Sequence, residues 1–90
     1  MLTSIKDRSV IVTGGSKGIG KGIAQVFAAQ GAKVMIGSRG EKDGNATVEE
    51  LRGSGGTAEF CQCDVSKWDS VQNLINQTVK AFGGLHVVCA

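Results

Sequence analysis

Glycines at positions 14, 18 and 20 follow the β-branched run Val10-Ile11-Val12, in an arrangement typical of a phosphate-binding turn. Without a Cβ, the backbone can turn tightly, a pyrophosphate can approach its N–H groups, and a helix can pack close to the strand. A helix starting there adds unpaired N–H donors and about half a positive charge. Gly14, Gly18 and Gly20 are therefore candidate dinucleotide-binding residues, although the gap between Gly14 and Gly18 departs from the common Gly-x-Gly-x-x-Gly spacing.

Ser38 and Arg39 stand at the end of the second expected strand, where dinucleotide folds place the adenosine ribose. A carboxylate there would bind a free 2′-hydroxyl and repel a 2′-phosphate, whereas a hydroxyl and a guanidinium offer a phosphate charge-assisted bonds. The pair therefore favours NADP(H), and Lys17 in the glycine turn would add to the preference. The alternative is that Arg39 pairs with Glu41 or lies in solvent, and that Lys17 is an exposed turn residue.

Asp64 ends the third expected strand and has two interpretations that position alone does not separate. Ligands of open α/β sheets bind outside the carboxyl ends of the strands, where this carboxylate could accept from an adenine amino group. An aspartate at such a position also often caps the adjoining turn or helix. His86, by contrast, begins the fourth strand at the end away from the binding crevice, so we expect a surface histidine.

Apolar periodicity predicts strands that alternate with helices along the whole chain. After the first strand, the expected elements are a helix over 18–30, a strand over 32–37, a loop over 38–44, a helix over 45–52, a strand over 57–63, a helix capped by Ser66, and a strand over 85–90. Ser66 and Asp69 resemble a capping box.

This alternation predicts an α/β fold with a doubly wound, Rossmann-type parallel sheet in the strand order 3-2-1-4. Residues 1–90 form one part of a single dinucleotide-binding domain in this interpretation, with the connectivity βαβαβαβ. An apolar strand at Ala90 would leave an uncovered sheet edge. We therefore expect these residues to be the first part of a longer protein.

Composition argues against several classes of function. A net charge of +2 and few aromatic residues do not favour a nucleic-acid partner. No apolar run approaches the roughly 18 residues of a membrane span, and the N-terminus lacks a signal peptide, so we expect a cytoplasmic protein without a membrane partner. Cys61, Cys63 and Cys89 form no Cys-x-x-Cys motif and accompany a single histidine, so reduced thiols are expected and no metal site.

The chain resembles the short-chain dehydrogenases/reductases, most closely the NADP-dependent 3-oxoacyl-acyl-carrier-protein reductases. Four motifs carry the resemblance: Thr13-Gly14-x-x-x-Gly18-x-Gly20, Ser38-Arg39, Cys63-Asp64-Val65 and Gly83-Gly84-Leu85-x-x-Val88. The resemblance implies that the cofactor phosphates are held by Gly14, Ser16, Lys17, Gly18, Ile19 and Gly20, the 2′-phosphate by Ser38 and Arg39, the adenine by Asp64 and Val65, and the ribose in part by Ala90.

The resemblance also implies an NADP(H)-dependent oxidoreductase that reduces a small carbonyl substrate or oxidises an alcohol, as a homotetramer or homodimer. The family's catalytic Ser and Tyr-x-x-x-Lys lie further along the chain, and this sequence contains no tyrosine, so no catalytic residue is expected within it. A non-catalytic nucleotide-binding module is the alternative if the chain ends at Ala90. Methyl transfer from S-adenosylmethionine is disfavoured, because that cofactor's ribose hydroxyls usually meet a carboxylate.

Overall fold

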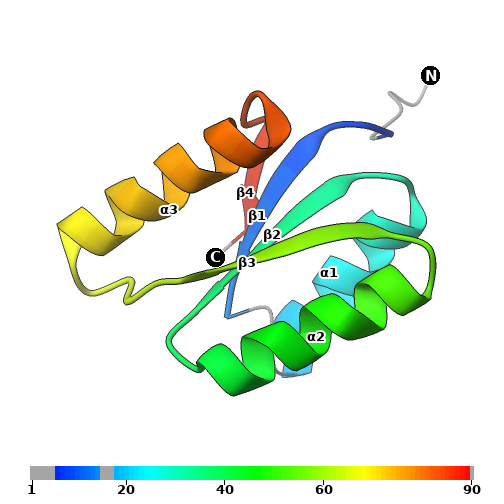
Figure 1. The fold of residues 1–90 in the computed structure, drawn as a ribbon, viewed down its shortest axis with the longest axis horizontal. Coiled ribbons are helices and arrows are strands. Elements are labelled where there is room, and N and C mark those ends of the chain that lie inside the picture. The colour runs from blue at the N-terminus through cyan, green and yellow to red at the C-terminus, as the bar shows by residue number, and fades with distance from the viewer. Residues whose placement is uncertain (1–5, 15–17, 90) are drawn as a thin grey trace.

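The structure is a computed structural model that describes residues 6–14 and 18–89, and it alternates strands with helices throughout (Figure 1). Its elements are β1 (Ser9–Thr13), α1 (Gly18–Ala29), β2 (Lys33–Ser38), α2 (Glu41–Gly53), β3 (Thr57–Gln62), α3 (Trp68–Phe82) and β4 (Val87–Cys89). Within the described ranges, none of the helices is long and apolar enough to cross a membrane.

The four strands form one parallel sheet in the order β3-β2-β1-β4. Val10 of β1 lies opposite Val34 of β2 on one side and Val87 of β4 on the other. Parallel neighbours require a crossover connection, and each helix supplies one. The predicted α/β class and the strand order 3-2-1-4 are therefore confirmed.

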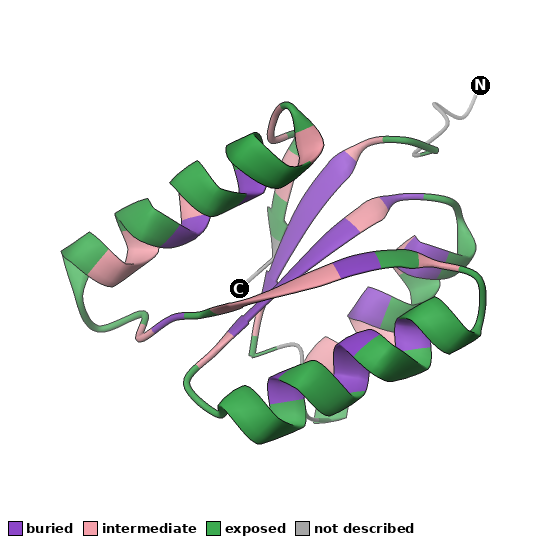
Figure 2. Ribbon diagram, in the orientation of Figure 1, coloured by how far each residue is buried: buried purple, intermediate pink, exposed green. Residues whose placement is uncertain are grey.

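Helices cover both faces of the sheet, with α1 and α2 on one side and α3 on the other (Figure 1). Because side chains alternate along a strand, Val10 and Val12 pack in the cluster that holds α1 and α2, whereas Ile11 packs with Leu74 of α3. The central strands are accordingly buried along most of their length (Figure 2). This two-sided burial explains why β1 and β2 have continuous apolar runs instead of alternating ones.

Two predicted boundaries differ from the structure by more than one residue. Helix α2 begins at Glu41, four residues before the expected start at Asn45. Glu41 and Asp43 lie in its first turn, where negative side chains are stabilised by the positive end of the helix dipole, so part of the polar stretch expected as a loop is helical. Strand β4 begins at Val87 instead of Leu85, and the Leu85 side chain packs in the cluster beneath α3.

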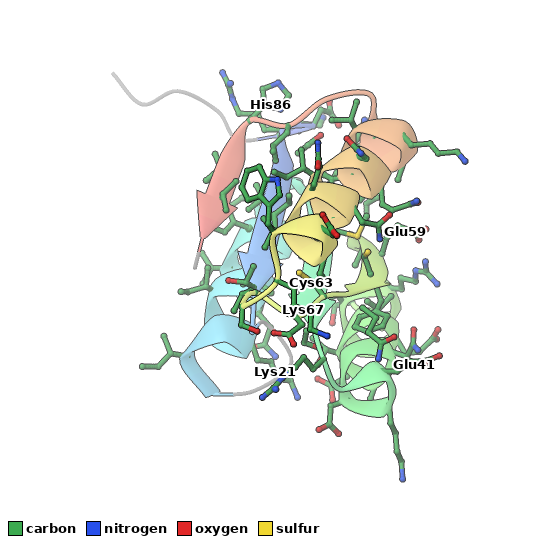
Figure 3. The ribbon with its side chains drawn as sticks, turned by 90° about the vertical axis from the view of Figure 1, so that its left-hand side faces the viewer. Lys21, Glu41, Glu59, Cys63, Lys67 and His86 are labelled. Carbon is green, nitrogen blue, oxygen red and sulfur yellow. The ribbon has the colours of Figure 1, made fainter. Side chains whose placement is uncertain are left out.

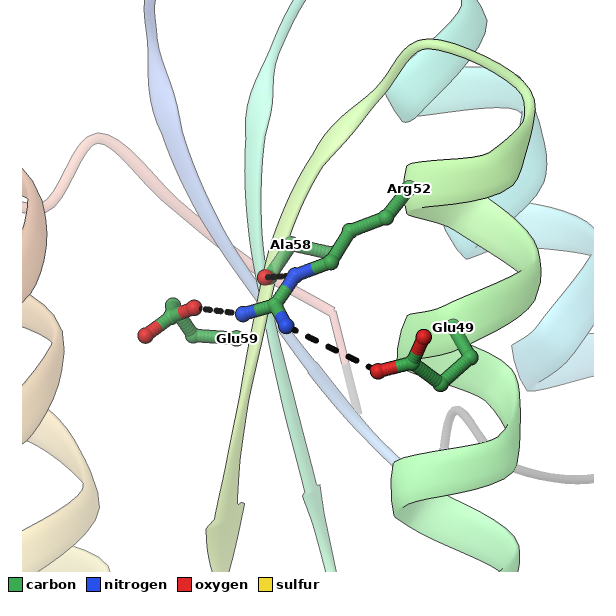
Figure 4. Close-up of polar contacts among 4 residues, drawn as sticks. All are labelled: Glu49, Arg52, Ala58 and Glu59. Atoms are coloured by element: carbon green, nitrogen blue, oxygen red, sulfur yellow. Dashed lines mark hydrogen bonds and ion pairs between the residues drawn. The ribbon is translucent and has the colours of Figure 1, made fainter.

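Arg52 of α2 ties this helix to the edge strand β3 (Figure 4). Its Nε–H donates to the carbonyl oxygen of Ala58 at 2.9 Å, and its terminal nitrogens pair with Glu59 and, at 3.8 Å, with Glu49. An edge strand presents unpaired backbone groups that can recruit another chain. Arg52 bonds to one of these groups, the Ala58 carbonyl, and its ion pairs with Glu49 and Glu59 place charged side chains around it.

The contact between α2 and β3 leaves no room for a side chain at Gly44. A Cβ built there would overlap the Phe60 ring, whereas a Cβ at Gly53, also in α2, would meet no atom. We expect Gly44→Ala to destabilise the protein by about 1–3 kcal/mol through overpacking, despite the helix propensity of alanine. The control Gly53→Ala should be neutral or stabilising, and urea unfolding of both variants measures the difference. Equal stabilities would contradict the packing argument.

Candidate functional site

A hollow of about 150 Å³ lies at the carboxyl ends of β1, β2 and β3. It is lined by Gly14, Gly37, Ser38, Arg39, Cys63 and Val65. Four of these residues, Gly14, Ser38, Arg39 and Val65, were predicted to contact a cofactor, and three separate strand ends bring them together. In open α/β sheets this edge is where ligands bind.

Gly14 and Gly18 frame the turn between β1 and α1. Both have positive φ angles, +67° and +54°, which residues with a Cβ rarely adopt, and a Cβ on either would meet no atom of the described residues. The Gly14 N–H donates to the Gly37 carbonyl oxygen at 2.8 Å, so this N–H is not free to bind a ligand. Gly14 instead allows the tight turn and lets a ligand approach the backbone closely. Gly20 is half-buried in the first turn of α1.

Three of the predicted cofactor residues lie outside the described part of the chain. Ser16 and Lys17 belong to the stretch between Gly14 and Gly18, and Ala90 follows β4. Their predicted roles therefore stay predictions.

Ser38 and Arg39 lie where β2 ends and the loop to α2 begins. The Ser38 hydroxyl donates to the Gly40 carbonyl oxygen at 3.3 Å, and Arg39 is exposed at the hollow. Within residues 6–14 and 18–89 no ion pair joins Arg39 to Glu41. The guanidinium is thus open to solvent beside the hollow instead of being neutralised by Glu41.

Asp64 closes the turn that follows β3. Its Oδ1 accepts hydrogen bonds from the Ser66 hydroxyl at 2.7 Å and from the Ser66 N–H at 3.0 Å. These two bonds, with smaller contributions from the charges of Arg39 and Lys67, lower the pKa of the Asp64 carboxyl. Of the two interpretations of Asp64, the one in which it caps a turn is confirmed, while the predicted contact with adenine stays a prediction.

The predicted capping role of Ser66 is wrong. Helix α3 begins at Trp68, and its N-cap is Lys67, which makes no side-chain capping bond. Ser66 lies one residue before this N-cap, in the aspartate turn, where its hydroxyl donates to Asp64 two residues earlier.

Ile19 and Val65 are two predicted cofactor residues with exposed apolar side chains, with 84% and 65% of their surface accessible. Val65 lines the hollow beside Arg39. Ile19 instead opens onto a second hollow of about 520 Å³ on α1, together with Ile23, Val26 and Phe27. The structure therefore brings Val65, but not Ile19, into the hollow at the strand ends.

His86 lies at the far end of the strands from Cys63 and Lys67 (Figure 3). Its Nδ1 accepts from the Ser9 backbone N–H at 2.9 Å, and the backbone N–H of His86 donates to the Ser9 carbonyl oxygen at 3.0 Å. His86 is exposed and pairs the start of β1 with the segment before β4. The expectation of a surface histidine away from the crevice is confirmed.

Cys61 and Cys63 are both free thiols. Cys63 is buried against Ile11 and Leu74 under α3, as expected for a small apolar side chain. Burial, and less strongly the nearby Cys63, raises the pKa of the Cys61 thiol, which makes it less reactive.

Residues 8–90 match the family described as short chain dehydrogenase. The chain belongs to this family. A curated relative, L-fucose dehydrogenase of Oryctolagus cuniculus, is 44% identical over 79 residues, covering 88% of this chain and 26% of that protein. Hydroxysteroid dehydrogenase from Escherichia coli superimposes with a TM-score of 0.91 at 30% identity, covering 93% of this chain and 35% of that one.

A metagenomic short-chain oxidoreductase solved in complex with NADP is also similar in structure. It superimposes with a TM-score of 0.88 at 31% identity, and the match covers 96% of this chain and 39% of that one. This short chain dehydrogenase sequence therefore spans between about a quarter and two-fifths of the length of these three relatives.

Two residues that bond to backbone next to the hollow, Gln62 and Ser70, were not singled out from the sequence of this short chain dehydrogenase. Gln62 donates from Nε2 to the Arg39 carbonyl oxygen at 3.1 Å, and the Ser70 hydroxyl accepts from the Asp64 N–H at 2.8 Å. Both hold backbone at the rim of the hollow. Their only signal in the sequence is a polar side chain near the end of a strand or the start of a helix, and many surface positions share that signal.

The hydrogen bonds from Ser66 predict how Asp64 titrates. Ser66→Ala removes the bond from the hydroxyl, so the pKa of the Asp64 carboxyl should rise toward its ordinary value of about 3.9. The stability that this bond contributes should be complete above that pH and disappear as the pH falls through the lower folded-state pKa. An NMR titration of the Asp64 carboxyl carbon measures the shift. Ser54→Ala, at the far end of α2, is the control and should leave the titration of Asp64 unchanged.

Proposed function

We propose that this chain is the NADP(H)-binding part of an oxidoreductase of the short chain dehydrogenase family. The observation that carries the proposal is the hollow at the ends of β1, β2 and β3, where Gly14, Ser38, Arg39 and Val65 meet. Arg39 presents an exposed guanidinium there, and none of the described residues that line the hollow has an acidic side chain that would repel a 2′-phosphate. The NADP complex of a structural relative is consistent with this cofactor.

Each residue has a proposed part in binding. Ser38 and Arg39 hold the 2′-phosphate, and Asp64 and Val65 hold the adenine at the end of β3. The turn before α1 takes the pyrophosphate, with the positive end of the helix beneath it. The residues proposed for that turn are Gly14, Ser16, Lys17, Gly18, Ile19 and Gly20, and Ala90 is proposed to contact the ribose.

In this proposal, these residues bind and orient the cofactor. Bound nicotinamide would donate or accept the hydride, and the protein around it orients the cofactor. The sequence contains no tyrosine, so the family's tyrosine acid is not among its residues, and we expect no turnover from these 90 residues alone. The proposed substrate is a small carbonyl compound or alcohol, and a homotetramer or homodimer is the proposed assembly.

The narrower likeness to 3-oxoacyl-acyl-carrier-protein reductases stays a prediction. The relatives described above are named for a sugar and for a hydroxysteroid, so they favour no single substrate class. NADP(H) over NAD(H) is likewise proposed from Ser38 and Arg39.

Removing the guanidinium tests the preference for NADP(H). Arg39→Ala should weaken NADP⁺ binding about tenfold to hundredfold, because each lost charge-assisted bond contributes roughly 1.5–3 kcal/mol. Affinity for NAD⁺ should change little, since that cofactor has no 2′-phosphate. Isothermal titration calorimetry of the full chain with both cofactors measures the two constants.

Lys80→Ala serves as the control for net charge, because Lys80 lies in the last turn of α3, at the other end of the sheet. It should leave both dissociation constants unchanged. If wild-type protein binds NAD⁺ as tightly as NADP⁺, the proposed cofactor preference is wrong.

A further inference from the structure

The side chain of Gln62, the last residue of β3, contacts the loop between β2 and α2. Its Nε2 donates to the carbonyl oxygen of Arg39 at 3.1 Å, although the two residues are 23 positions apart in the sequence. Both side chains are exposed, so this contact is no part of the apolar core. The bond connects the end of β3 with the loop that follows β2, beside the hollow.

The backbone on either side of Arg39 is held by other bonds. The Ser38 carbonyl oxygen accepts from the Cys63 N–H at 2.9 Å, which continues the pairing of β2 with β3. The Gly40 carbonyl oxygen accepts from the Gly44 N–H at 2.9 Å, which starts α2. Between these two fixed points, the carbonyl of Arg39 is held by the side chain of Gln62.

The orientation of this peptide group affects where the Arg39 guanidinium points. The bond from Gln62 restrains the plane of the Arg39–Gly40 peptide. It thereby restrains the ψ angle of Arg39, which sets the direction in which the side chain leaves the backbone. An arginine side chain loses much rotational freedom when it binds a phosphate, and a backbone held beforehand reduces the total ordering that binding requires. Binding groups held by a supporting hydrogen bond are better placed for their ligand.

We infer that Gln62 is a positioning residue for Arg39 and contributes to selecting adenosine ligands that carry a 2′-phosphate. The inference rests on the proposed function, in which Arg39 holds that phosphate. Gln62 acts through the backbone of Arg39 and not by contact with the phosphate. Its effect should therefore appear in the ratio of affinities for ligands with and without a 2′-phosphate.

The variant Gln62→Met tests this role, because methionine has a similar length and no N–H donor. The ligands are 2′,5′-ADP and 5′-AMP, which differ by the 2′-phosphate and need no catalytic residue. Calorimetry on the full chain should show affinity for 2′,5′-ADP falling by about twofold to tenfold, the range expected for one hydrogen bond between neutral groups. Affinity for 5′-AMP should stay the same.

The control Gln30→Met makes the same chemical change at an exposed position just after α1, at the opposite end of the sheet. It should leave both affinities unchanged. A merely structural role for Gln62 would lower both affinities together or neither, and either result would overturn the inference.

The proposed function and the inference fail in different ways. If wild-type protein does not bind 2′,5′-ADP more tightly than 5′-AMP, the proposed role of Arg39 is wrong, and with it the inference. If wild-type protein and Arg39→Ala differ in this ratio while Gln62→Met matches wild type, only the role of Gln62 is wrong. A thermal unfolding curve of Gln62→Met that matches wild type shows that a changed ratio comes from binding.

Discussion

The parallel pairing of β1, β2 and β3 is the constraint on which the rest of the structure depends. Parallel strands end at the same edge, so the residues that follow each strand meet there without contact along the sequence. Gly14, Ser38 and Val65 share one hollow for this reason. The pairing in turn depends on burial from both faces, by α1 and α2 on one side and α3 on the other.

At that edge, hydrogen bonds within the protein determine which groups remain open to a ligand. The Gly14 N–H is taken by Gly37, and one oxygen of Asp64 is taken by Ser66. The guanidinium of Arg39 remains in solvent while its carbonyl is held by Gln62. The chain thus holds the backbone around the hollow and leaves a cationic side chain at its rim, an arrangement suited to an anion.

Where the sequence-based expectations were wrong, a second local interaction favoured a different structure. Ser66 fits the capping pattern before α3, yet the carboxylate of Asp64 is two residues away and accepts both its N–H and its hydroxyl. The polar stretch after Arg39 has glycines that suggest a loop, yet Glu41 and Asp43 stabilise a helix from Glu41 onward. In each case two local rules applied, and only the folded geometry showed which prevailed.

The sequence by itself determined the fold class, the strand order and most of the residues at the hollow. Apolar runs and glycine breaks are local signals that repeat along the chain, and parallel sheets allow few connections between such elements. The tertiary structure alone decided which side chains bond to the backbone of another element. Gln62 to Arg39, His86 to Ser9 and Arg52 to Ala58 depend on strand register and helix placement, which no local pattern encodes.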